Sequence, residues 1–160
     1  MKRGFIIEAF RLINGIKMNT VQDKATRSAI IGNHLQMYKV AEKHENEAKE
    51  VYKKLFEGKE EDARKVNELR QEYNSTGVSN ERKVEIVKEI STAYTPILEL
   101  EQELNAAING MLAEEVEVKI IPFNKESFVN ACADSNLEFT MIDIIRLNDL
   151  FEEEKIVEDK

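Results

Sequence analysis

The residues of this 160-residue chain that could act as metal ligands or as a nucleophile with its base are His34, His44 and Cys132. The two histidines are ten residues apart, which would place them on different faces of a helix, and neither belongs to a Glu-x-x-His pair. Cys132 lies in an apolar run, far in sequence from any histidine that could form its thiolate. We therefore expect a packed, hydrogen-bonded His34, a solvated His44 and a buried, unreactive Cys132.

The motifs of other catalytic chemistries are missing. The six glycines form no phosphate-binding loop, and no Gly-x-Ser-x-Gly motif is present to expose a nucleophilic serine. Glu114–Glu115 and Glu152–Glu154 are neighbours along the chain, which is typical of solvated charge and not of an acid–base pair. The sequence predicts a protein that is not an enzyme and that uses no metal or cofactor. A metal-dependent enzyme whose site no motif announces is kept as an alternative.

The net charge of −8 is concentrated in the last third of the chain. Residues 1–112 contain 18 basic and 18 acidic residues, whereas residues 113–160 contain 5 basic and 13 acidic ones. A neutral body with an acidic end argues against binding to a nucleic-acid backbone. An acidic face usually serves solubility, but it could also bind a basic protein as a mimic of phosphate.

The sequence predicts no membrane span and no export signal. The longest uncharged runs fall well short of the ~18 apolar residues that a spanning helix needs. Glu8 and Arg11 interrupt the apolar start of the chain, and no small-residue cleavage site follows. Because one cysteine allows no internal disulfide, a reducing cytoplasm is the expected location.

The polarity pattern predicts two helices in the first half of the chain. Apolar residues lie on one arc of a short helix over about 3–14, which Asn14 and Gly15 end. From about residue 21 the polarity pattern is helical, and one heptad frame runs from Ile31 to Tyr73, with the charged Glu45, Lys59 and Asp62 among its members. Because the pattern keeps its frame across Gly58, we predict one long helix through this glycine, bent there at most.

A turn at residues 74–80 is followed by a second long helix with a regular apolar stripe. Thr95–Pro96 is expected either to kink this helix or to restart it, with Thr95 as the cap. The short turn makes the two long helices antiparallel, and counting back from it places Tyr52 near Glu101. The predicted seam of this hairpin consists of Tyr52, Val87, Ile90, Tyr94, Ile97, Glu101, Leu104, Ile108 and Met111.

The period of the pattern changes after the hairpin. Residues 115–120 alternate between charged and apolar, which predicts a strand whose inner face is Val116, Val118 and Ile120. Since a lone strand is unstable, we expect it to pair with residues 137–139 or with a second subunit, which makes it a possible interaction strand. Asn124 is expected to cap a helix to about residue 133, and Thr140 with Asp143 to start a last helix.

Residues 103–118, ELNAAINGMLAEEVEV, resemble an uncharacterised family of small tailed-phage and prophage proteins. The resemblance extends to the layout of a short helix, a long charged helix, a return helix with a Glu-Val-Glu-Val strand, and a helical end. It implies a phage or prophage origin, and with it a location in the cytoplasm of a bacterial host or in the virion. The family has no assigned activity, so the resemblance implies no site residues.

We therefore expect a mainly α-helical protein with a long antiparallel, coiled-coil-like hairpin. Residues 1–112 would form the hairpin body with the N-terminal helix, and residues 113–160 an acidic α/β subregion of the same domain. The expected function is a non-catalytic structural, assembly or accessory role through protein–protein contacts, with inhibition of a host nucleic-acid enzyme or defence system as an alternative. The apolar arcs are broader than two helices need, which also predicts a homo-oligomer.

Overall fold

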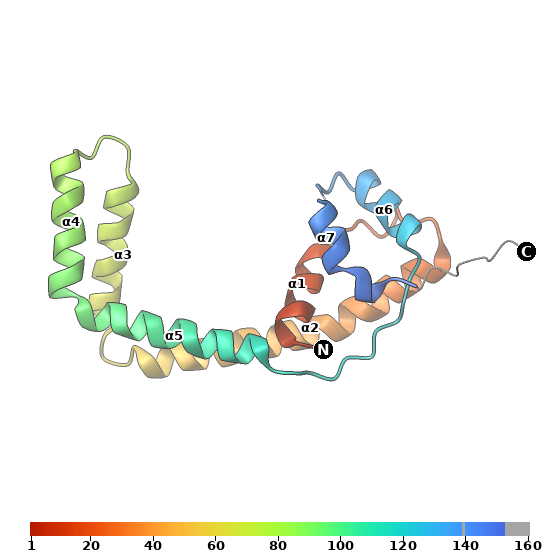
Figure 1. Cartoon of the computed structure of the whole chain (residues 1–160), viewed down its shortest axis with the longest axis horizontal. Coiled ribbons are helices and arrows are strands. Elements are labelled where there is room, and N and C mark those ends of the chain that lie inside the picture. The colour runs from red at the N-terminus through yellow and green to blue at the C-terminus, as the bar shows by residue number, and fades with distance from the viewer. Residues whose placement is uncertain (139, 153–160) are drawn as a thin grey trace, which may run out of the picture. The chain divides into compact units, whose positions relative to one another are not determined.

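The computed structural model describes residues 1–138 and 140–152, and these are mainly helical, as expected. Isolated β-bridges are the only strand-like pairings within the described ranges. Figure 1 shows the elements in chain order. They are α1 (Arg3–Ile13), α2 (Lys24–Leu55), α3 (Glu60–Asn74), α4 (Asn80–Ala93), α5 (Thr95–Ala113), α6 (Lys125–Asp134), α7 (Met141–Arg146) and the short 3-10 helix η1 (Asn148–Leu150).

The chain forms two compact units that differ from the subregions expected from the charge pattern. The first unit joins residues 1–44 to the chain from residue 112 onward, and the second unit is residues 45–111. The N-terminus belongs with the C-terminal third because the Arg3 amide donates a hydrogen bond to the Glu114 carbonyl at 2.8 Å, and the Val116 amide donates to the Met1 carbonyl at 2.8 Å.

The first unit has a continuous apolar core from α1, the first half of α2, α6 and the region around η1. Three phenyl rings lie at its centre, with Phe123 5.4 Å from Phe128 and 5.5 Å from Phe151 between ring centroids. Its buried residues are Ile6, Ala9, Ile13, Ile16, Val21, Ala29, Ile30, Met37, Phe123, Phe128, Ala131, Cys132, Leu147, Leu150 and Phe151.

Local signals placed the short helices correctly. The side chain of Asn124 caps α6 by accepting from the Ser127 amide, and Thr140 with Asp143 forms the expected capping box of α7. The start of α2 is different from the prediction. It was expected near residue 21, but α2 begins at Lys24, where the Asp23 carboxylate accepts a hydrogen bond from the Thr26 amide at 2.6 Å.

The prediction of one continuous helix through Gly58 is wrong. Helix α2 ends at Leu55, α3 begins at Glu60, and Gly58 between them has a φ of +73°. The turn buries Phe56 in the core of the second unit, with Ala63, Val66 and Ile97. Helices α2 and α3 both turn an apolar face toward that core. The heptad frame of the sequence therefore continues from α2 to α3, although the helical backbone is broken at Gly58.

The φ of Gly58 makes a substitution there informative. Gly58→Ala is expected to lower the free energy of unfolding by about 1 kcal/mol, because an L-residue is strained in the left-handed region. Gly110→Ala is the matched control, since Gly110 lies within α5 with no atom near an added Cβ, and it should stabilise by about 0.5–1 kcal/mol. Urea denaturation measures the free energy of unfolding of both variants. If Gly58→Ala were stabilised, the left-handed turn at Gly58 would be contradicted.

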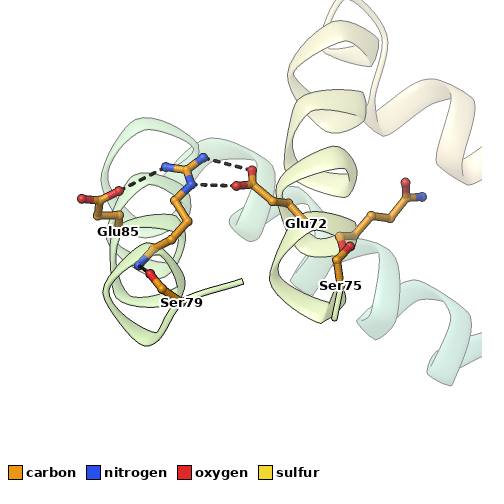
Figure 2. Close-up of polar contacts among 6 residues, drawn as sticks. Glu72, Ser75, Ser79 and Glu85 are labelled. Carbon is orange, nitrogen blue, oxygen red and sulfur yellow. Dashed lines mark hydrogen bonds and ion pairs between the residues drawn. The ribbon is translucent and has the colours of Figure 1, made fainter. Parts of the chain in front are cut away.

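The second unit is built around the α3–α4 hairpin, whose turn is fixed by polar contacts (Figure 2). The Ser79 hydroxyl caps α4 by accepting from the Arg82 amide, and Gly77 adopts a φ of +93°. The Arg82 guanidinium donates to both carboxylate oxygens of Glu72, at 2.7 and 3.0 Å. Arg82 therefore ties the start of α4 to the end of α3, and its hydrogen bonds lower the pKa of the Glu72 carboxyl.

The return helix is restarted at Pro96, which was one of the two expected outcomes. Helix α4 ends at Ala93 and α5 begins at Thr95. The Thr95 hydroxyl donates to the Ser91 carbonyl, so Thr95 does not act as the cap. The long hairpin is thus broken twice. In the second unit α3 pairs with α4 (Figure 1), and Leu55 of α2 and Leu104 of α5 both pack against the core around Phe56 and Ile97.

Candidate protein-interaction site

The three residues that could act as metal ligands or as a nucleophile, His34, His44 and Cys132, do not form a common site. His34 Nε2 donates a hydrogen bond to Asn14 Oδ1 at 2.8 Å, and the His34 ring lies 4.9 Å from the Phe10 ring, so His34 is packed as expected. His44 follows on the same helix and is half-buried, not fully solvated. In the part of the chain that the structure describes, no three His, Cys, Asp or Glu side chains are grouped closely enough to hold a metal ion.

Cys132 is buried in the core of the first unit, and burial raises the pKa of its thiol to about 12. Because the reactive species is the thiolate, Cys132 should react with a disulfide reagent at pH 8 only when the protein opens. We expect no labelling of the folded protein over minutes and full labelling in 6 M guanidinium, followed by absorbance. Rapid labelling under native conditions would contradict the burial of this residue.

The predicted hairpin seam is only partly a core. Ile97 is fully buried, with Ile90, Tyr94 and Leu104 packed around it. Ile108 and Met111 are half-buried. Val87 and Tyr52 are exposed by 54% and 44%, so their assignment to a seam is wrong.

The predicted register fails at Val87 and at Tyr52. Helix α4, which begins after the turn at residues 75–79, buries Ile86 in place of Val87. Val87 instead lines an open groove of about 310 Å³. Glu101 does not meet Tyr52, because both its carboxylate oxygens accept from the Arg70 guanidinium, at 2.6 and 2.7 Å. Tyr52 stacks on Phe56 in its own chain segment, with 4.6 Å between ring centroids.

Residues 114–123, the extended segment, replace the predicted strand. Val116, Val118 and Ile120 pack against the core of the first unit, as the alternating pattern predicted. However, the segment forms no ladder with residues 137–138, and Phe139 lies outside the described residues. Its ends form single bridges instead, between Glu115 and Lys2 and between Phe123 and Phe151.

Two side-chain amides of α2 hold the middle of the extended segment. Asn33 donates to the Ile121 carbonyl and accepts from the Ile121 amide, both at 2.8 Å. Gln36 does the same with Lys119, at 2.9 and 3.2 Å. Because Asn33 and Gln36 are three residues apart on a helix, their amides match alternate residues of an extended backbone. A helix face thus takes the place of a neighbouring strand.

Three strongly exposed apolar side chains lie together on α7, and we call them the α7 face. Met141, Ile142 and Ile145 are exposed by 76%, 59% and 66%. Their spacing puts them on one side of the helix. The Arg146 guanidinium donates to the Glu8 carboxylate of α1 at 2.6 Å, which fixes the end of α7 on the unit.

A second apolar surface, the α2 stripe, lies on the side of α2 opposite its buried residues. It is centred on Ile31, Leu35 and Tyr38, which are exposed by 43%, 59% and 46%. Beside it, a groove of about 240 Å³ is lined by side chains of α1, the following loop and α2. The lining includes Ile13, Ile16, Met18, Ile31 and Leu35.

No helix among the described residues is long and apolar enough to cross a membrane. Comparison of the chain with protein-family models, with curated proteins and with solved structures finds no match.

Proposed function

We propose that this chain is a non-catalytic protein that acts through protein–protein contacts, and that the apolar face of α7 binds the partner. The observation that carries the proposal is the exposure of Met141, Ile142 and Ile145 on a short helix that is capped and anchored to α1. Covering an apolar side chain of this size contributes about 1.5 kcal/mol or more. A fixed helix with three such side chains in water is typical of a binding site.

The partner class that we propose is a structural or assembly protein of a phage or prophage. This part of the proposal rests on the resemblance of residues 103–118 and on the apolar character of the α7 face. The protein would then act in the bacterial cytoplasm or in the virion.

The alternative of an acidic inhibitor is supported less well by the described residues. Glu114 is paired with Arg3 at 2.6 Å, and the Asp143 carboxylate is used in the cap of α7. These two carboxylates are used in contacts within the fold. Residues 153–160, which contain four of the acidic side chains of this region, lie outside the described residues.

The test is affinity capture with the full tagged chain from cells in which the phage or prophage replicates. Ile142→Asp and Ile145→Asp should each lose at least 90% of a captured phage protein, because each would bury a charge in the interface. Val129→Asp is the control, since Val129 is 41% exposed on α6 and outside the α7 face.

Identification of the captured protein separates the classes of function. A phage structural protein that is lost only with the α7 variants supports the proposal. A basic host protein whose capture disappears with added salt would favour the acidic inhibitor instead. Equal capture by all variants would overturn the assignment of the partner site to α7.

A further inference from the structure

The α2 stripe has a regular spacing that extends beyond its three apolar residues. Going along the helix in steps of four and three, the exposed positions are Lys24, Ser28, Ile31, Leu35, Tyr38 and Glu42. This is the spacing of the a and d positions of a coiled coil. The opposite side of the same helix buries Thr26, Ala29, Ile30, Asn33 and Met37 in the core of the first unit. Helix α2 therefore has a second stripe at heptad spacing, apolar at its centre and charged at both ends, that no described part of the chain buries.

The order of residue types along this stripe would match that of a second copy running in the opposite direction. A basic residue stands at one end, an acidic residue at the other, and the large apolar residues lie between them. If two copies of α2 cross antiparallel about a two-fold axis, Ile31 of one copy meets Leu35 of the other. In the next layer Ser28 meets Tyr38, and in the last layer Lys24 meets Glu42.

We propose that the α2 stripe is a self-association site, at which a second copy of this chain binds as an antiparallel two-helix coiled coil. The proposal deepens the proposed function, since it rests on the same premise that this protein works through protein contacts, but it uses a different surface. The two Ile–Leu layers supply apolar burial, the Ser–Tyr layers pair hydroxyl groups, and the Lys–Glu layers set the orientation. The Tyr38 hydroxyl already donates to Glu42 at 2.8 Å, which holds both side chains along the stripe.

The charges select the antiparallel arrangement over the parallel one. A parallel pair would oppose Lys24 to Lys24 and Glu42 to Glu42, whereas the antiparallel pair makes an attractive contact at each end. The groove beside Ile31 and Leu35, of about 240 Å³, offers space for an apolar side chain of the second copy. The stripe from Lys24 to Glu42 is about 27 Å long, at 1.5 Å per residue, which is enough for six layers.

The experiment is sedimentation equilibrium of the full chain, with charge-reversed variants measured alone and mixed. The unchanged protein should form a dimer of twice the 18.5 kDa of one chain. Lys24→Glu places like charges at both ends of the antiparallel pair, and so does Glu42→Lys, so each variant alone should dimerise about tenfold more weakly. An equimolar mixture of the two variants restores an attractive pair at both ends and should recover the original affinity as a heterodimer.

The outcomes distinguish this proposal from the proposed function. Leu35→Asp should abolish the dimer while circular dichroism shows an unchanged fold, because Leu35 is 59% exposed. The α7 variant Ile145→Asp should dimerise like the unchanged chain, and Leu35→Asp should still capture the partner of α7. A monomer at 100 μM for the unchanged chain, or a mixture that is no tighter than its components, would overturn the α2 site and leave the α7 site standing.

Discussion

Ile97→Asp is expected to lower the free energy of unfolding by about 4 kcal/mol or more. Ile97 is 1% exposed and contributes to the small core of the second unit with Phe56, Ala63 and Val66. The substitution removes the buried apolar group and places a carboxylate in an apolar core. Chemical denaturation followed by circular dichroism measures the loss.

Val87→Asp is the matched control for this substitution. Both positions belong to the same apolar stripe in the sequence, but Val87 is 54% exposed. A charge there remains in water, so the change should be within about 0.5 kcal/mol. Equal losses of unfolding free energy for the two variants would support the continuous seam. No loss for Ile97→Asp would contradict the core of the second unit.

Asn33→Leu should lower the free energy of unfolding by about 2–4 kcal/mol, although it replaces a polar buried residue with an apolar one of similar size. Asn33 is fully buried, and its amide satisfies both backbone groups of Ile121. Leucine would leave the partly buried amide and carbonyl of Ile121 without their partner, at a cost of about 1–2 kcal/mol each.

Gln36→Leu provides the comparison. Gln36 makes the same two contacts with Lys119, but at a position that water can reach. Water can replace the lost amide there, so the loss should be about 1 kcal/mol or less. Hydrogen exchange of the Ile121 and Lys119 amides reports the two contacts separately. If Asn33→Leu leaves both the stability and the exchange of Ile121 unchanged, the amides do not hold the extended segment.

The sequence predicts those elements whose signals are local. The cap at Asn124 and the capping box of Thr140 and Asp143 are contacts between residues three apart, and both were correctly expected. The amphipathic pattern likewise located α1 to within a residue. Such contacts depend on neighbours in the chain, which a single sequence displays directly.

The break at Gly58 was missed for a different reason. A heptad frame reports which residues face a core, and it does not report whether the backbone between two frames is continuous. Gly58 fits both a bent helix and a left-handed turn, and burial of Phe56 decides between them. Along α4 the predicted frame was wrong by one residue, since Ile86 is buried and Val87 is exposed.

The partners of the extended segment could not be predicted from the sequence. The alternation of residues 115–120 identified an inner face correctly, but the pairing groups are the amides of Asn33 and Gln36, more than 80 residues earlier. A polar residue on a helix gives no sign of a partner so far away. The α7 face was missed because a short apolar helix in sequence is as typical of a core as of a surface.

Site-specific photo-crosslinking from position 142 in replicating cells tests the protein-contact function most directly. A photoreactive amino acid at Ile142 should form a crosslink to one phage protein, and the same group at Val129 on α6 should not. Because the photoreactive side chain reacts only with atoms that it touches, the crosslink reports direct contact at the α7 face. Absence of any crosslink at position 142 beyond that at position 129, with the fold intact by circular dichroism, would contradict a partner-binding role for α7.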